Sequence, residues 1–400
     1  MDVSHIEALH DLGYLPLHIK ALPEGSFVPY RVPLLTIRNT LPEFYWLTNM
    51  VECVLSNELW PMITSATTYN AYRKLFVKYA EQTGAPKAFI PYQGHDFCYR
   101  GMFGRHAGAM SGGAVLLAGG VGTDNIPGID FVETFYGADV DTEVVGKSVP
   151  ASEHSVVTSY GASNELETLR HLLTVVYPSG IFSYVSDSWD FWKLVTEYLP
   201  QLKELIMSRD GKLVIRPDSG NPVEILCGID NPPIDATPPQ KGLIQCLWET
   251  FGGTVNEAGF KVLDSHIGAI YGDSITYERA DAILSRLAKK GFASNNVVLG
   301  IGSYTYTHVT RDTHGIAVKS THAIINGKGV DIFKDPKTDP GTKKSAKGYL
   351  MVTQTDGVYG LKDQVSPTQE KHGCLETVFL DGKLMQRKTL AEIRALATSN

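Results

Sequence analysis

The sequence predicts an α/β fold, with a parallel α/β barrel-like domain in the middle of the chain and a mostly antiparallel α+β domain built from both chain ends. Three observations predict it. Apolar runs in the middle region end in polar or glycine-rich turns that lead into helix-like stretches, as in parallel sheets and barrels. Both chain ends carry short runs broken by proline and glycine, as antiparallel strands do. A length of 400 residues suffices for two or three domains.

The N-terminal region, residues 1–85, is expected to contribute strands and helices to the antiparallel domain. The stretch LPLHIKALPEGSFVPYRVPLLTIRNT alternates apolar and polar residues between prolines and glycines, which favours strands. Two helices are predicted to follow, over Pro42–Trp60 and Ser65–Thr83, and Gly84 would end the second one.

The C-terminal region, residues 320–400, is expected to complete the same domain. Its strand-like stretches GYLMVTQTDGVYGLK and ETVFLDGKLMQR each contain an Asp-Gly pair, at Asp356-Gly357 and Asp381-Gly382, which is typical of hairpin turns. Residues 86–319 are left for the barrel-like domain.

Four apolar runs in this middle region are followed directly by polar residues or glycines, which we call strand tips. In KLVIRPDSGNP, Pro217 ends the strand because it has no N–H to donate, so Arg216 and Asp218 lie at its C-terminal end. One such tip is as often a surface ion pair as a site. Recurrence favours a ligand site, because ligands bind where the C-terminal ends of parallel strands converge. The four tips are Ser186, Asp187 and Asp190; Arg216 and Asp218; Gly272, Asp273 and Ser274; and Gly300, Gly302 and Ser303.

Composition restricts the class of protein. The net charge of −7 argues against non-specific binding to nucleic acid. The longest apolar stretches are too short to span a bilayer and the N-terminus lacks a signal-peptide pattern, so a cytoplasmic protein without a membrane partner is expected. Five cysteines without CxxC spacing favour reduced thiols over disulfides or structural zinc. The lysine-rich stretch from Phe333 to Gly348 is either a solvated loop or an approach path for anions.

Several motifs together resemble one family. GHDFCYRGMFG, GTDNIPG and SVPASEHS precede VSDSWD, IRPDSGNP, YGD and FKDP, in an order and spacing similar to those of the nicotinamide phosphoribosyltransferase family. The resemblance covers nearly the whole chain and implies a type II phosphoribosyltransferase fold. It implies a pentosyltransferase that forms nicotinamide mononucleotide and pyrophosphate from nicotinamide and phosphoribosyl pyrophosphate in NAD biosynthesis.

The resemblance also implies roles for residues around the pyridine ring. Phe97 would stack on the ring, and Arg100 would donate to the amide oxygen or to phosphate. Asp124 would accept from the carboxamide and repel the charge of nicotinate, which favours nicotinamide as the substrate. Ser186 is a further substrate-binding residue, and Arg216 would orient the ring or the phosphates.

Other roles concern the sugar and its phosphates. Asp218 would face the ribose and the developing positive charge, and Gly272 and Asp273 would meet the ribose hydroxyls. The backbone N–H groups around Gly302 and Ser303 would bind the 5′-phosphate. Arg311 and Lys319 are candidate phosphate ligands beside them.

The family also implies an ATP-linked step. His154 would be phosphorylated by ATP, with Asp190 holding its tautomer. Magnesium is expected with the polyphosphate substrates, and Glu153 could help to place it. A homodimer with active sites at its interface is expected.

The chain departs from the family pattern at two places. No DSYK-like motif occurs before LPLHIKALPEG, although its tyrosine forms the second face of the ring sandwich in the family, so an N-terminally shortened member is expected. GIGSYTYTH replaces the glycine-rich phosphate loop. Two alternatives stay open: a truncated homologue that binds nucleotide with little turnover or needs a second chain, and a nicotinate phosphoribosyltransferase.

Overall fold

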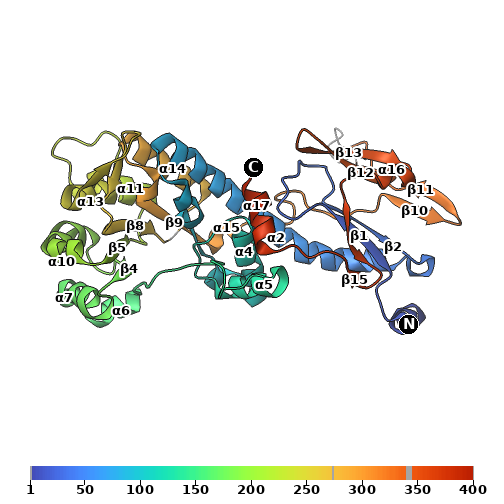
Figure 1. Ribbon diagram of the computed structural model, residues 1–400, viewed down its shortest axis with the longest axis horizontal. Helices are drawn as coiled ribbons and strands as arrows, with labels where there is room; N and C mark the ends of the chain where they lie inside the picture. Colours follow the sequence, from blue (N-terminus) through green and yellow to red (C-terminus); the bar gives the residue numbers. More distant parts are fainter. Residues whose placement is uncertain (1, 273, 339–344, 400) are drawn as a thin grey trace. The chain divides into compact units, whose positions relative to one another are not determined.

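The computed structural model describes residues 2–272, 274–338 and 345–399 (Figure 1). The chain divides into two compact units, residues 1–64 with 309–400, and residues 65–308. The first unit is therefore assembled from both chain ends, and the second is the middle of the chain. The unit boundaries fall at 64/65 and 308/309, whereas the sequence had placed them at 85/86 and 319/320.

The first unit is antiparallel. Its four-stranded sheet has the order β15-β14-β1-β2, so that β1 (Leu17–Ala21) pairs with the nearby β2 (Leu35–Asn39) and with β14 (Glu376–Leu380) from the other chain end. The two expected hairpin turns are present, with positive φ at Asp356 and Asp381. The remaining elements of this unit are β10 (His322–Ile325), β11 (Lys328–Asp331), β12 (Tyr349–Thr355), β13 (Val358–Val365), β15 (Lys383–Leu384), α1 (Ser4–Leu12), η1 (Pro42–Phe44), α16 (Pro367–Glu370) and α17 (Leu390–Thr398).

One long helix replaces the two expected between residues 42 and 83. α2 runs over 37 residues, from Leu47 to Thr83, with Pro61 inside it. A proline inside a helix removes one backbone hydrogen bond, because it lacks an N–H, and crowds the preceding turn. Its fixed φ nevertheless suits a helix, and α2 continues through it. The unit boundary lies within this helix.

The second unit is built on a parallel sheet with the order β3-β9-β8-β5-β4. These strands are β3 (Gly94–Phe97), β9 (Val297–Gly302), β8 (Ile267–Tyr271), β5 (Gly211–Arg216) and β4 (Gly180–Val185). Phe97 pairs with Gly302, and Val185 pairs with Arg216, so the strands end at matching heights. The predicted α/β class with parallel strands is confirmed.

Two short segments join the edges of this sheet. Residues 121–124 pair with β3 through Asp96 and Thr123, and with a second segment, residues 147–152, through Gly122 and Lys147. That second segment also pairs with β4 through Ala151 and Ser183. All of these bridges are parallel, so the five strands and two segments form a closed ring. The barrel-like form of the middle unit follows from this closure.

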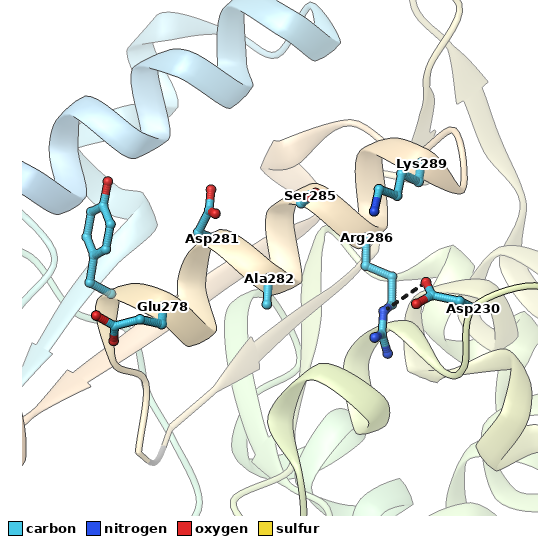
Figure 2. Close-up of a pocket in the computed structure, with 8 residues that line it drawn as sticks. Asp230, Glu278, Asp281, Ala282, Ser285, Arg286 and Lys289 are labelled. Atoms are coloured by element: carbon cyan, nitrogen blue, oxygen red, sulfur yellow. Dashed lines mark ion pairs between the residues drawn. The ribbon is translucent and has the colours of Figure 1, made fainter.

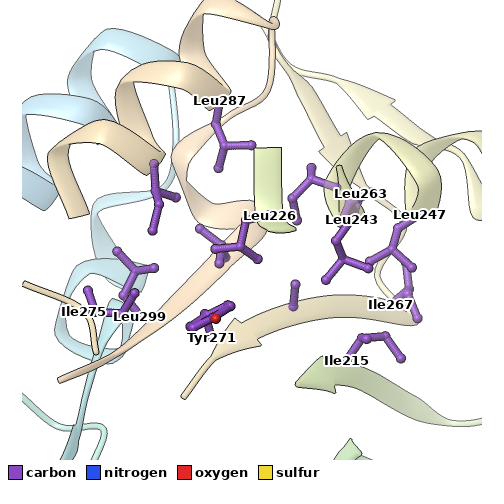
Figure 3. Packing of buried hydrophobic residues seen from close by; sticks show 14 of the residues in the cluster. Ile215, Leu226, Leu243, Leu247, Leu263, Ile267, Tyr271, Ile275, Leu287 and Leu299 are labelled. Carbon is purple, nitrogen blue, oxygen red and sulfur yellow. The ribbon is translucent and has the colours of Figure 1, made fainter. Parts of the chain in front are cut away.

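Helices cover the outside of the barrel and bury its apolar residues. Leu226 on α11 (Pro222–Cys227), Leu243 on α13 (Leu243–Phe251) and Leu287 on α14 (Tyr277–Lys289) pack toward Ile215 and Leu299 of the sheet (Figure 3). Burial of each such side chain stabilises the fold by about 1.5–3 kcal/mol. The other elements of this unit are η2 (Lys87–Phe89), α3 (Ile90–Gln93), η3 (Tyr99–Gly101), α4 (Arg105–Leu117), α5 (Ile126–Tyr136), α6 (His154–Ser159), η4 (Ala162–Asn164), α7 (Glu165–His171), η5 (Leu172–Val176), α8 (Phe191–Lys193), η6 (Leu194–Tyr198), α9 (Leu199–Gln201), α10 (Lys203–Ser208), α12 (Pro238–Lys241), β6 (Gly253–Val255), β7 (Lys261–Leu263), η7 (Ser294–Asn296) and α15 (Ser303–Thr307).

Across the described part of the chain, none of the helices combines the length and the apolar character needed to cross a membrane.

Candidate active site

The closed barrel brings the predicted strand tips to one end. Because all strands and both joining segments are parallel, the residues that follow them emerge on the same rim. In order around the ring these are Phe97, Gly302 and Ser303, Gly272, Arg216 and Asp218, Ser186 and Asp187, His154, and Asp124.

His154 lies between a hydroxyl and two carboxylates. Its Nδ1 is 3.1 Å from Ser188 Oγ, while its Nε2 is 3.8 Å from Asp187 Oδ1 and 3.6 Å from Asp218 Oδ2. The other oxygen of Asp187 accepts the backbone N–H of Asp218 at 3.1 Å. The tips of β4 and β5 are therefore tied together beneath the imidazole ring.

Arg216 is buried and fixed from two sides. Its Nη2 donates to the carbonyl of Ser152 at 2.9 Å, and its Nε is 3.6 Å from Asp218 Oδ2. Asp218 also packs closely on Gly272, where an added Cβ would lie 2.5 Å from its Oδ1. Glycine is thus required at 272 because any side chain would displace the carboxylate. Ser186 is fully buried on the neighbouring tip, and its Oγ has no hydrogen-bond partner among the described residues.

The opposite side of the rim carries two rings and a carboxylate. The rings of His95 and Phe97 lie 4.4 Å apart at 35°, and Phe97 covers Gly300, where a Cβ would be 2.7 Å from the ring. His95 Nε2 is 3.1 Å from Asp124 Oδ1, which also accepts from Ser148 Oγ.

The Asp124 carboxylate is held in its ionised form. Burial raises its pKa, but the hydrogen bonds from His95 and Ser148 and the charge of Arg216 outweigh this, so the pKa lies below its usual value. A fixed negative charge therefore stands beside the Phe97 and His95 rings.

His154, Asp187 and Asp218 could also hold a cation. Each offers one ligand atom, and the three atoms lie within 4.8 Å of one another. The Asp187 side chain is only 6% exposed, and its Oδ1 has no hydrogen-bond partner among the described residues. Carboxylate oxygens suit Mg²⁺, so the donor set fits the magnesium expected with polyphosphates.

Some predicted residues lie elsewhere. Asp190 caps α8 by accepting the N–H of Lys193 at 3.0 Å, and the groups that contact the His154 ring are Ser188, Asp187 and Asp218 instead. Glu153 is exposed at the start of α6 and is not part of the three-residue cluster.

Other predicted site residues are not among the rim residues named above. Arg100 is exposed on η3. Arg311 and Lys319 belong to the first unit. Asp273 and residues 339–344 of the lysine-rich stretch are outside the described residues.

Five residues of the site were given no role of their own by sequence reasoning, although Asp187 was named on its strand tip. They are His95, Ser148, Ser152, Asp187 and Ser188. All of them stand inside the motifs HDF, SVPAS and VSDS; four are one or two positions from a predicted residue, and Ser148 is five positions before Glu153. Their roles depend on which side of a short tip each side chain occupies, which the motif alone does not specify.

A separate surface depression of about 390 Å³ runs along α14 (Figure 2). It is lined by acidic and basic side chains, and Arg286 Nε is 3.2 Å from Asp230 Oδ1 across one end. This depression contains none of the strand tips. The candidate site is therefore identified by the convergence of the strand tips and not by this depression.

Comparisons with known proteins agree with the fold and the motifs. Residues 92–382 match the nicotinate phosphoribosyltransferase (NAPRTase) family model. A nicotinamide phosphoribosyltransferase of Acinetobacter baylyi is 52% identical over 98% of this chain and 78% of its own length. A protein of the same name from Mycoplasma pneumoniae is 38% identical over 86% of this chain and 73% of its own length.

A solved structure supports the fold alone. The nicotinate-nucleotide pyrophosphorylase of Pyrococcus furiosus aligns over 99% of this chain and 83% of that chain, with a TM-score of 0.58 at 14% identity. With the family model matched over most of the sequence and close relatives aligned along nearly all of it, the chain belongs to the nicotinate phosphoribosyltransferase family.

Proposed function

We propose that this chain is a nicotinamide phosphoribosyltransferase, a pentosyltransferase that makes nicotinamide mononucleotide and pyrophosphate from nicotinamide and phosphoribosyl pyrophosphate in NAD biosynthesis. The observation that carries the proposal is the ionised Asp124 beside the Phe97 and His95 rings, on a chain 52% identical to a protein of this name. In the reaction the ring nitrogen bonds to the anomeric carbon, and the bond to the pyrophosphate oxygen breaks with its electron pair leaving on pyrophosphate. The site must hold a flat ring, stabilise positive charge and bind phosphates.

The ring side supplies recognition. Phe97 stacks on the pyridine ring, and Asp124 accepts from the carboxamide N–H. The same carboxylate opposes the carboxylate of nicotinate, which selects nicotinamide by repulsion of the wrong substrate. Arg100, exposed on its turn, donates to the amide oxygen or to phosphate.

The sugar side supplies charge stabilisation. Asp218, held by Asp187 and Arg216, faces the ribose and the positive charge that develops at the anomeric centre. Ser186, whose buried hydroxyl has no hydrogen-bond partner among the described residues, is a further substrate-binding residue in this proposal. Gly272 and Asp273 bind the ribose hydroxyls.

The residues proposed to bind the 5′-phosphate lie at the C-terminal end of β9. An added Cβ at Gly302 would meet nothing within 4 Å, so there is open space beside this backbone for the 5′-phosphate to approach Gly302 and Ser303. Arg311 and Lys319 are further phosphate ligands in this proposal.

We propose that His154 is the ATP-linked group. Ser188 Oγ lies 3.1 Å from Nδ1, and when the hydroxyl accepts from a protonated Nδ1 the lone pair stays on Nε2, which is the nucleophile in this proposal. Nε2 bonds to the terminal phosphorus of ATP while the bond to ADP breaks and its electrons leave on ADP. Asp190 acts only indirectly, through the start of α8.

Magnesium completes this centre. Two carboxylates within 3.8 Å of Nε2 would repel an incoming phosphate, and a bound Mg²⁺ would supply positive charge that offsets this repulsion. Asp187 and Asp218 would hold the ion, with Glu153 as a further candidate.

The chain is proposed to act as a homodimer with active sites at its interface. A cytoplasmic location is proposed as well, because all five cysteines are free thiols.

The decisive experiment measures nicotinamide mononucleotide formed by the purified chain from nicotinamide, phosphoribosyl pyrophosphate and Mg²⁺, with and without ATP. Asp218→Ala is the blank, and nicotinate replaces nicotinamide in a parallel reaction. Product with nicotinamide only, increased by ATP in wild type but not in His154→Gln, is expected. A chain that binds the mononucleotide in calorimetry but forms no product would refute the enzyme as proposed and favour a truncated or two-chain system.

A further inference from the structure

We infer that Asp96 is a positioning residue that holds the two strand tips of the nicotinamide-ring site in register. The inference rests on the proposed function, since it takes Phe97 and Asp124 as the ring-binding side chains. Asp96 lies between His95 and Phe97 on β3 and is fully buried, so it cannot itself contact the substrate.

The Asp96 carboxylate accepts hydrogen bonds from both tips. Oδ1 accepts the backbone N–H of Cys98 at 2.9 Å, which fixes the turn directly after Phe97. Oδ2 accepts from Thr123 Oγ1 at 3.3 Å and from Asn125 Nδ2 at 3.4 Å, one residue to each side of Asp124. One side chain therefore sets the local conformation on both sides of the ring site.

The backbone alone does not provide this link. Asp96 N donates to the Gly122 carbonyl at 2.9 Å, and Asp124 N donates to the Asp96 carbonyl at 3.2 Å. These bonds align the two extended segments, and the backbone N–H of Asn125 donates to Thr123 Oγ1 at 2.9 Å, but they leave the turn directly after Phe97 unfixed and the Thr123 hydroxyl without an acceptor. The carboxylate adds those constraints.

The network continues into the helices behind the site. Asn125 caps α5 by accepting the N–H of Gly128 at 3.0 Å, and its Nδ2 donates to the carbonyl of Gly108 on α4 at 2.8 Å. A side chain at Gly112 of α4 would clash with the Asn125 amide, so the amide is closely enclosed. The contacts of Asp96 thus connect the two strand tips with α4 and α5.

The chemistry of the donors explains why the residue is an aspartate. All three are uncharged donors, and only a carboxylate presents acceptors in every direction. An asparagine would aim its NH₂ group at one of them and leave buried donors unpaired. Burial raises the pKa of Asp96, while the hydrogen bonds from Cys98 and Asn125 oppose that rise.

The test compares Asp96→Asn and the pair Thr123→Val and Thr123→Ser with wild type. Asp96→Asn is expected to raise the KM for nicotinamide about 10-fold or more, because buried donors lose their acceptor, while the KM for phosphoribosyl pyrophosphate changes less than about 3-fold. Thr123→Val should act in the same direction more weakly, and Thr123→Ser, which keeps the hydroxyl, should restore the wild-type KM. Asp130→Asn, an exposed acid on α5, is the control.

A second readout does not depend on turnover. Amide hydrogen exchange at Cys98 and Asp124 should accelerate about 10-fold or more in Asp96→Asn and in Thr123→Val, with β5 unchanged. Equal changes in both KM values, or exchange that rises uniformly over the second unit, would show that Asp96 only supports folding and would overturn the inference. If wild type forms no product, the proposed function fails while the exchange experiment still decides the role of Asp96.

Discussion

Replacing Glu165 with glutamine should change the pH dependence of stability. Glu165 begins α7, is 3% exposed, and its Oε1 has no hydrogen-bond partner among the described residues. Burial, reinforced by the charge of Asp190 and opposed by Lys193, raises its pKa from 4.5 to about 7. The folded chain therefore binds a proton here that the unfolded chain has released.

The sign and size follow from proton linkage. Between pH 4.5 and 7 the folded state holds one more proton than the unfolded state, so stability falls by about 1.4 kcal/mol per pH unit. The loss reaches about 3 kcal/mol by pH 8, an upper value for one group. Because glutamine resembles the protonated acid, Glu165→Gln should match wild type near pH 4.5 and exceed it by up to about 3 kcal/mol at pH 8. For a unit of this size that corresponds to roughly 6–12 °C in Tm.

Thermal unfolding at half-unit steps from pH 5 to 8 measures this difference. The matched control is Glu167→Gln on the same helix, where the wild-type glutamate is exposed and paired with Arg170, and its Tm difference should stay near zero. A Glu165→Gln difference that does not change with pH would refute the reasoning, because it would mean that the buried carboxyl does not titrate in this range.

Three other substitutions test the site and the first unit. Gly300→Ala should destabilise the second unit by about 1–3 kcal/mol in chemical denaturation and raise the KM for nicotinamide, because the new methyl would lie 2.7 Å from the Phe97 ring. Asp124→Asn should raise the ratio of kcat/KM for nicotinate over nicotinamide about 10-fold, because it removes the repelling charge. Lys20→Met should lower the stability of the first unit by about 3–5 kcal/mol, because it leaves Glu370, its partner at 2.7 Å, buried without a counter-charge.

Each of these has a control. Gly302→Ala adds a methyl with nothing within 4 Å and should leave the denaturation midpoint unchanged. Ser148→Ala removes one hydrogen bond from Asp124 but keeps its charge, so it should preserve selectivity. The double variant Lys20→Met with Glu370→Leu should recover stability if the buried charge is the cause. A loss in the double variant as large as in Lys20→Met would contradict that account.

The fold could be predicted where the local sequence of an element indicates its secondary structure. The β5 run Leu213, Val214 and Ile215 ends at Arg216-Pro217, and the structure has a strand over Gly211–Arg216. Closure of the barrel could not be predicted, because residues 121–124 and 147–152 pair through isolated bridges and contain no long apolar run. The sequence predicted two helices where the structure has the single helix α2, which continues through Pro61.

The site was predictable to the level of the strand tip but not of the side chain. Arg216, Asp218 and His154 were named and lie together. Asp190 was named as the partner of His154, yet it caps α8, while Asp187, three residues earlier, reaches Nε2. A motif shows which residues follow the end of a strand. The direction in which each side chain points depends on the conformation of the turn that follows.

The segment that closes the barrel also connects the two halves of the site. Along residues 147–152, Ser148 donates to Asp124 on the ring side, and the carbonyl of Ser152 accepts from Arg216 on the sugar side. His154 follows directly, within 4 Å of Asp218. Because the segment is bonded to both edges of the sheet, neither half can move without straining pairs of the other. The arrangement gives a physical route by which a change at His154 can reach the Asp124 carboxylate, along bonds that already hold the barrel closed.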